Sequence, residues 1–284
     1  MLLFHADDYG INISQAERIL ACRRKGRLNS VSLLVNSPEA RQCAAMLPKD
    51  VRCRLHLNFR EGKCLSDPRR LPLLTDREGR FKLSFGALLL LSVLRKRELE
   101  RELRTETRSQ IERYFSLMGE DCPLRIDSHG HYHMIPLVWD VLLTCCMDMG
   151  KRIEEIRIPA EPFGPVLGCR KIWGRIPVSG VIKNLLMHVF RFRNRLLGPH
   201  PEGFDDRRTA PLFFGMTFTT RMFPATVRCL LPSFQKLASR EGRDLELMFH
   251  PGGLKGKEEL WDPKFAAFHL SPDRDREAMT LISI

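Results

Sequence analysis

Four short segments rich in Asp and His contain the side chains of this sequence that can bind a metal or move a proton. Each follows a short apolar run that is typical of a β-strand. If these strands run parallel in one sheet, their carboxyl ends meet at one edge, and the four segments converge there. Carboxylates and imidazoles together predict a divalent metal centre with an acid–base pair. The segments are residues 5–10, 55–58, 127–133 and 248–252.

The first segment contains two adjacent carboxylates, Asp7 and Asp8. An apolar strand precedes them, Gly10 permits a tight turn, and Asn12 or Ser14 can cap a following helix. We therefore expect both carboxylates to be presented at a strand end and not buried, one as a metal ligand and the other beside a water. An Asp–Asp pair can also merely cap a helix. The three further His-bearing strand ends favour the metal interpretation.

The histidines differ in how strongly they point to a site. A single histidine such as His56 is more often a hydrogen-bonded structural residue, but it lies at an expected strand end. His129, His131 and His133 alternate, and on an extended segment they would share one face. Packing alone seldom places three imidazoles together, so this cluster predicts a functional site. We expect structural roles for the remaining candidates, which are His188, His200 and His269.

Taken together, these motifs resemble in order and spacing the YdjC-like carbohydrate deacetylases, which include chitooligosaccharide deacetylases. The resemblance extends from residue 1 to about residue 275. It departs from the family pattern at Arg54, where a Gly is usual. The motifs are Ala6-Asp7-Asp8-Tyr9-Gly10, Leu55-His56-Leu57-Asn58 with Glu61-Gly62, Asp127-Ser128-His129-Gly130-His131-Tyr132-His133-Met134, and Phe249-His250-Pro251-Gly252.

The resemblance implies one divalent metal ion, magnesium or zinc, held by Asp8, His56 and His129, with Asp7 as general base and His250 as general acid. This assignment suits amide hydrolysis. A metal with one carboxylate and two imidazoles keeps positions for water and the acetyl oxygen, while an acid protonates the leaving amine. The donor set by itself equally suits cobalt, nickel or manganese.

We therefore expect a metal-dependent hydrolase of carbohydrate metabolism that removes acetyl groups from N-acetylated sugars. A lipid-linked or nucleotide-linked amino sugar is the alternative substrate. Arg157 can instead be a member of a structural ion pair. The residues expected to contact the sugar are His131, His133, Arg157 and Glu161.

The remaining pattern favours an α/β fold, a single-domain distorted (β/α) barrel over residues 1–284 with rim insertions near 60–95 and 165–208. The chain has 284 residues, 43% of them hydrophobic, and can bury one large core. Strand-like and helix-like segments alternate, as parallel sheets require. Strands are expected at 1–4, 29–35, 51–55, 123–126, 155–159, 212–218 and 245–249, and helices at 12–26, 38–47, 96–118, 135–149 and 225–240.

Three further segments have distinctive compositions. Helix 96–118 is dense in charge and is expected to be a solvated outer helix. Residues 85–94 are apolar but too few to span a bilayer, so a helix over the barrel rim is expected. Residues 181–197 are amphipathic and basic. This pattern is typical of an interfacial helix, although we favour an exposed helix of a substrate lid.

Overall composition limits the other classes of function. Nine cysteines show no C-x-x-C pair and are expected to be reduced thiols. No signal-peptide pattern opens the sequence, which predicts a cytoplasmic protein. A net charge of +12 makes a basic nucleic-acid-binding protein the alternative of another class, but no such motif accompanies it, so we expect no nucleic acid. A weak contact with anionic membrane surfaces and a homodimer are also compatible with the sequence.

Overall fold

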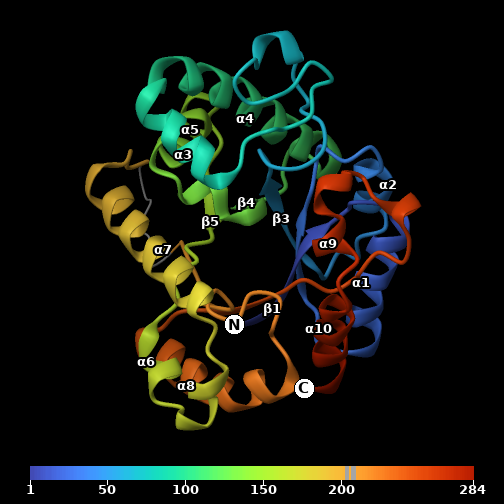
Figure 1. Ribbon diagram of the computed structural model, residues 1–284, viewed down its shortest axis with the longest axis vertical. Helices are drawn as coiled ribbons and strands as arrows, with labels where there is room; N and C mark the ends of the chain where they lie inside the picture. The colour runs from blue at the N-terminus through green and yellow to red at the C-terminus, as the bar shows by residue number, and fades with distance from the viewer. Residues whose placement is uncertain (202–204, 206–208) are drawn as a thin grey trace.

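The computed structural model describes residues 1–201, 205 and 209–284, and seven parallel strands of these residues form one sheet (Figure 1). The strand order is β5-β4-β3-β2-β1-β7-β6. The carboxyl ends of all seven strands therefore lie at the same edge of the sheet. The strands are β1 (Leu2–Tyr9), β2 (Ser30–Leu33), β3 (Arg52–Leu57), β4 (Leu124–Ser128), β5 (Ile153–Ile156), β6 (Leu212–Phe214) and β7 (Leu245–Phe249).

The sheet is curled into an incomplete barrel. At the edge formed by β5, the backbone N–H of Ile156 donates to the carbonyl of Thr209, three residues before β6, so the two outer strands approach each other. β5 and β6 themselves are not paired. The predicted α/β barrel-like fold is thus confirmed, in the form of a half-barrel of parallel strands.

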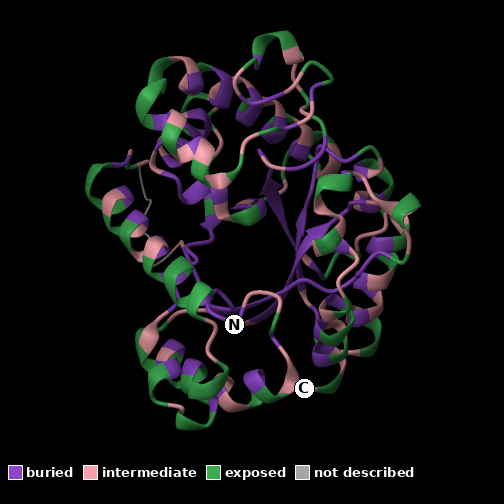
Figure 2. Cartoon of the chain, in the orientation of Figure 1, coloured by how far each residue is buried: buried purple, intermediate pink, exposed green. Residues whose placement is uncertain are grey.

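Helices surround the strands, and their outward faces are exposed while the strands are buried (Figure 2). The helix after β1 begins where expected, because the Asn12 side chain accepts a hydrogen bond from the Gln15 N–H. The helices are α1 (Ile13–Lys25), α2 (Ala40–Ala45), α3 (Phe85–Leu94), α4 (Lys96–Met118), α5 (Pro136–Asp148), α6 (Phe163–Leu167), α7 (Val178–Leu197), α8 (Pro224–Glu241), α9 (Ala266–His269) and α10 (Pro272–Ser283).

Short 3₁₀ helices occur in the connections, including the two segments in which insertions are expected. Residues 60–95 contain α3 and one such turn, and residues 165–201 contain the last part of α6, all of α7 and another 3₁₀ turn. The last part of the expected insertion, at 202–204 and 206–208, lies outside the described residues. The single-domain division stays a prediction. The 3₁₀ helices are η1 (Pro68–Arg70), η2 (His129–Met134), η3 (Arg170–Arg175), η4 (Lys257–Glu259) and η5 (Pro263–Phe265).

Helix α4 has its predicted bounds, but the expectation that its charged residues are all solvated is wrong. Glu102 and Glu106 are buried. Glu102 accepts hydrogen bonds from the backbone N–H groups of Leu73 and Leu74, and Glu106 accepts from those of Leu65 and Ser66. These two carboxylates therefore fix the long connection after β3, whose backbone donors would otherwise lack partners.

The expectation of nine free thiols is wrong for two cysteines. Cys169, beside η3, forms a disulfide with Cys229 in α8, whereas the other seven are free. Spacing in the sequence does not reveal this pair, because its members lie 60 residues apart. Among the described residues, no helix is both long enough and apolar enough to cross a membrane.

Beneath the strand ends, the centre of the barrel is charged. The guanidinium of Arg54, in β3, is fully buried and pairs with Glu246 of β7 at 2.6 Å and with Glu155 of β5. A second arginine, Arg157, lies 2.6 Å from the other oxygen of Glu246. The residue that departs from the family pattern thus lies below the candidate site and links strands from both halves of the sheet.

Replacing Arg54 by Met should destabilise the protein by about 3–5 kcal/mol, because Glu246 would lose a buried counter-charge. Arg52 is the matched control. It pairs with the same Glu155 at 2.9 Å, but its side chain is 21% exposed. Its replacement by Met should therefore cost less than about 1 kcal/mol. Urea unfolding of both variants measures the difference, and equal losses would contradict the argument.

Candidate active site and metal centre

The four Asp- and His-rich segments meet at the carboxyl ends of the strands, as predicted. Neighbouring strands are in register there: His56 of β3 is opposite Asp127 of β4, and Ala6 of β1 is opposite Phe249 of β7. A cleft of about 730 Å³ opens above this edge. The residues of the four segments that line the cleft are Asp7, Asp8, His129, Gly130, His131, Tyr132 and His250.

Asp8, His56 and His129 form a group that can hold a metal ion. An oxygen of Asp8 lies 3.3 Å from Nε2 of His56 and 2.9 Å from Nδ1 of His129. One ligand atom from each residue lies within 4.8 Å of the others, and all three residues are buried. Nε2 of His56 is buried without a hydrogen-bond partner. An orphaned imidazole nitrogen beside a carboxylate is the environment that a divalent cation would satisfy.

The two adjacent aspartates diverge because of a backbone feature. Asp8 has a φ of 64°, in the left-handed region, whereas β1 is otherwise extended. Both carboxylates border the cleft, but their residues are only 1–2% exposed. The expectation that they are not buried is therefore wrong, since neighbouring side chains close over them from several strands.

Carboxylates behind the imidazoles fix their orientation. Asp127 lies 2.6 Å from Nδ1 of His56. Burial alone would lower the pKa of His56, but the Asp127 and Asp8 carboxylates raise this pKa to about 10. Without a metal, His56 is therefore protonated at neutral pH. A bound cation would replace that proton, while Asp127 would still hold the ring through Nδ1.

A ring of buried polar contacts surrounds the other two candidate ligands. Nε2 of His129 lies 3.1 Å from one oxygen of Glu61. The other Glu61 oxygen lies 2.7 Å from Nε2 of His269. Nδ1 of His269 is 3.4 Å from Arg274, which in turn lies 3.1 Å from Asp8. The structural role expected for His269 thus includes support of the candidate metal centre.

Asp7 belongs to a different set of contacts. Its two oxygens accept hydrogen bonds from Arg157 at 2.7 and 2.8 Å. Burial alone would raise the pKa of Asp7, but the Arg157 guanidinium holds it well below the usual range. His5, Asp7 and Asp127 are also close enough to hold a metal. However, Arg157 lies 3.0 Å from Asp127 as well, so a positive charge already lies between these two carboxylates.

His250 follows β7 and faces Asp7 across the cleft floor. Its Nε2 lies 3.9 Å from an Asp7 oxygen, and its backbone N–H donates to Glu277 of α10. Burial lowers the pKa of His250 to about 4 and raises that of Glu277 to about 7. His250 is therefore neutral at pH 7 in the free protein. Its buried Nδ1 has no hydrogen-bond partner.

Of the residues expected to contact a sugar, His131 lines the cleft. His133, Arg157 and Glu161 are not among the described residues that line it. His133 hydrogen-bonds with Ser128 and with the backbone carbonyl of Arg157. Glu161 accepts from the backbone N–H groups of Gly215 and Met216. The ion pairs of Arg157 with Asp7, Asp127 and Glu246 support the alternative considered for Arg157, a structural ion pair. Glu161 anchors the loop after β6.

The predicted alternation of the histidines fails for a local reason. Residues 129–134 form η2, and Gly130 and His131 have φ values of 62° and 61°. The segment is therefore a tight turn, and its three imidazoles point to three different environments. Glu61, His269 and Arg274 had not been assigned to the site. A signal for Glu61 is its place three residues after the Leu-His-Leu-Asn motif.

The walls of the cleft come from the two insertions and the segment after β7. Phe85 at the start of α3 packs edge-to-face on Tyr132 and stacks on Phe190 of α7, whose Leu186 and Met187 also line the cleft. The expectation that both rim segments border the pocket is confirmed. The cleft also receives aromatic and cationic side chains, including Arg60, Lys82, Lys183, Lys264, Phe265 and Phe268.

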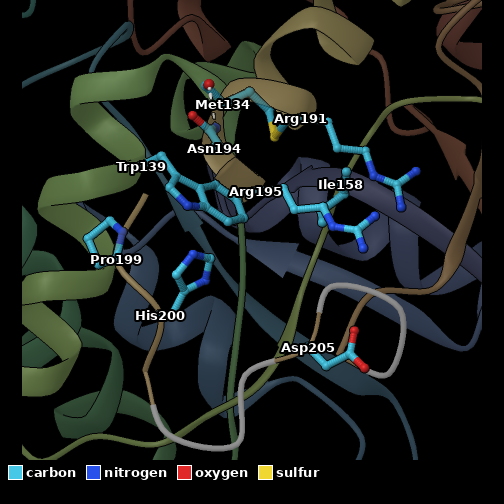
Figure 3. Close-up of a pocket in the computed structure, with 9 residues that line it drawn as sticks. All are labelled: Met134, Trp139, Ile158, Arg191, Asn194, Arg195, Pro199, His200 and Asp205. Carbon is cyan, nitrogen blue, oxygen red and sulfur yellow. Dashed lines mark hydrogen bonds between the residues drawn. The ribbon is translucent and has the colours of Figure 1, made fainter. Parts of the chain in front are cut away.

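A separate pocket of about 200 Å³ lies against the other end of α7. Figure 3 shows Trp139, His200, Arg191 and Arg195 around it. The candidate metal ligands are not among its lining residues. The chemistry described here therefore belongs to the larger cleft.

The fold and site define an α/β half-barrel protein with an Asp-His-His candidate metal centre at the carboxyl ends of its strands. A family model described as YdjC-like protein matches residues 1–283. The chain belongs to this family.

Relatives with assigned names are similar to parts of the chain. A carbohydrate deacetylase of Danio rerio is 33% identical over 164 residues, 57% of this chain and 50% of the relative. One of Mus musculus is 27% identical over 257 residues, covering 88% and 77%. A chitooligosaccharide deacetylase of Escherichia fergusonii is 31% identical over 153 residues, covering 53% and 57%. The match thus spans only half of the Danio rerio protein.

A solved structure supports the fold alone. It is that of an Enterococcus faecalis protein named for cellobiose-phosphate cleavage, with a TM-score of 0.60 and 16% sequence identity. The match covers 99% of this chain and 90% of the other.

Replacing Asp8, His56 or His129 by Ala should remove bound metal, because each supplies one of the clustered ligand atoms. His131→Ala is the matched control, since His131 lines the same cleft but lies outside the group, and it should keep full metal content. Elemental analysis of the purified variants measures this. Full metal content in the His129→Ala protein would reject the ligand assignment.

Proposed function

We propose that this protein is a metal-dependent deacetylase of N-acetylated carbohydrates. The observation that carries the proposal is the arrangement of two carboxylates with separate environments, Asp8 beside two imidazoles and Asp7 beside Arg157. The names of the relatives supply the substrate class. Amide hydrolysis needs both a metal and a proton carrier, and these two environments suit those tasks.

In this proposal Asp8, His56 and His129 hold one divalent cation, magnesium or zinc. When bound, the cation would lower the pKa of a water molecule and polarise the acetyl carbonyl. Asp127 keeps the His56 ring turned toward the centre through Nδ1. Glu61 lies against the far nitrogen of His129. The ligands are therefore held in place before any substrate enters.

Asp7 is the proposed general base. Because Arg157 keeps it ionised, an oxygen is available at neutral pH to accept the proton of the attacking water. His250 is the proposed general acid for the departing amine nitrogen. It is neutral in the free protein, so it must first receive a proton. Asp7 lies 3.9 Å away and would supply that proton through a bridging water or after the two side chains approach.

The cleft above these residues suits a sugar. Phe85, Tyr132, Phe265 and Phe268 present aromatic surfaces, on which sugar rings pack through their apolar faces. His131 reaches the same space from η2 and is the remaining sequence-predicted candidate for a sugar contact. Lys82 and Lys183 at the mouth add positive charge, which favours a substrate with anionic groups nearby.

Asp7→Asn and His250→Ala should keep bound metal, because neither is a proposed ligand, but turnover should fall by roughly 10²- to 10⁴-fold. In each variant the pH–rate profile should lose the limb that arises from titration of the replaced side chain. Steady-state kinetics and elemental analysis of the same preparations separate chemistry from binding. An Asp7→Asn protein without metal would show that Asp7 shares the cation.

The substrate class is tested by measuring acetate release from a panel of N-acetylated mono- and oligosaccharides. Activity should disappear with a chelator and return when magnesium or zinc is added back. Acetate release that is insensitive to the chelator would contradict the metal-dependent mechanism. No release from any member of the panel would contradict the substrate class.

A further inference from the structure

Helix α7 exposes a continuous apolar stripe to solvent. Its members recur at alternating spacings of four and three residues, which places them along one face of the helix. Each is more than half exposed, with Val178 at 74% and Phe192 at 68%. The outer side of this helix is visible in Figure 2 as a row of exposed segments. The stripe consists of Val178, Ile182, Leu185, Val189, Phe192 and Leu196.

The opposite face holds α7 rigidly, so the helix cannot turn to bury the stripe. At Gly180 a Cβ atom would lie 2.0 Å from the Thr217 carbonyl oxygen, so the backbones are in close contact. Asn184 accepts from the backbone N–H of Glu161 and donates to its carbonyl, at 2.8 and 2.9 Å. Near the other end, Asn194 donates to the Met134 carbonyl at 3.0 Å.

The sequence around the stripe contains cationic but no acidic residues, and Arg193 pairs with Asp140 of α5 at 2.6 Å. Residues 162–201 include no Asp or Glu. Trp173, in the short helix before α7, is 52% exposed, and indoles favour the boundary between lipid and water. Seven cationic side chains occur in the same stretch: Arg170, Lys171, Arg175, Lys183, Arg191, Arg193 and Arg195.

We propose that α7 docks on an anionic lipid surface. The stripe would enter the boundary between head groups and acyl chains, and the exposed cations beside it, such as Arg170, Lys171 and Arg175, would lie among the head groups. Charge complementarity favours this occupant over a second copy of the chain. Two α7 helices packed through their stripes would bring cations against cations, with no acidic residue on either helix to pair them.

Docking also determines what reaches the active site, a consequence that rests on the proposed deacetylase function. α7 forms both the stripe and one wall of the cleft, through Lys183, Leu186 and Met187. A protein lying on its stripe therefore has the mouth of its cleft beside the head groups. The substrate class that fits is an N-acetylated amino sugar carried by a membrane lipid.

Co-sedimentation of the whole protein with vesicles tests the docking. Vesicles of phosphatidylcholine with phosphatidylglycerol should bind it, and vesicles of phosphatidylcholine alone should bind it much less. Binding should weaken as salt is added, because screening acts on the cationic contribution. The double variant V189S/F192S should bind anionic vesicles at least about tenfold more weakly, because it removes two apolar anchors.

The matched control is M147S/M279S, which removes two side chains that are exposed to similar extents, 52% and 59%, but lie outside α7. Its binding should equal that of the unchanged protein. Equal binding by V189S/F192S and the control would overturn the proposal. So would light scattering that shows a dimer which V189S/F192S dissociates, together with no sedimentation on anionic vesicles.

Activity measured in parallel separates this proposal from the proposed function. Acetate release from an N-acetylglucosaminyl lipid in anionic vesicles should exceed release from the same sugar without lipid, and V189S/F192S should lose only that excess. Equal release from both would overturn the lipid-linked substrate class. If neither sugar is deacetylated while the protein still sediments with anionic vesicles, the proposed function fails and the docking stands.

Discussion

The Arg157 guanidinium is the constraint on which the site depends. It contacts three buried carboxylates, those of Asp7, Asp127 and Glu246, at 2.6 to 3.0 Å. Bringing these carboxylates together under a cleft without a counter-charge would be costly, because each would be desolvated and would repel the others. The Arg157 guanidinium thereby keeps Asp7 ionised and holds Asp127 behind His56. The positions of the proposed base and of a proposed metal ligand are therefore coupled through Arg157, which is not among the candidate ligands or the described residues that line the cleft.

The same contact explains how two adjacent aspartates can have different roles. Asp7 lies on the extended part of β1 and faces Arg157, whereas the left-handed backbone at Asp8 directs its carboxylate to His56 and His129. Arg274 on α10 then holds the second oxygen of Asp8. A positive charge already occupies the position between Asp7 and Asp127. In the group of Asp8, His56 and His129, by contrast, Nε2 of His56 is buried without a hydrogen-bond partner.

Much of the fold could be predicted because local patterns determine it. The strand at 245–249 and the helix at 96–118 have their expected bounds, since each has a distinct apolar or charged periodicity. Convergence of the four motifs followed from the parallel order of the strands. What failed depends on tertiary contacts. Three features involve residues far apart in the chain, and sequence periodicity carries no information about such contacts. They are the burial of Glu102 and Glu106, the disulfide, and the carboxylates around Arg157.

The turn at 129–134 failed for another reason. Alternating histidines share one face only if the backbone is extended. Here Gly130 permits a left-handed backbone conformation, which His131 also adopts. The assignment of His129 as a ligand did not depend on that pattern. It came from the family resemblance, and its position beside Asp8 is consistent with it.

The central claim is that the cation binds to Asp8, His56 and His129 and not to the neighbouring group of His5, Asp7 and Asp127. Anomalous diffraction at the zinc absorption edge, from crystals of the zinc-loaded protein, locates the ion directly. The account predicts one peak about 2.0–2.2 Å from a carboxylate oxygen of Asp8 and a ring nitrogen of each histidine. A peak among His5, Asp7 and Asp127, with Arg157 displaced, would contradict it.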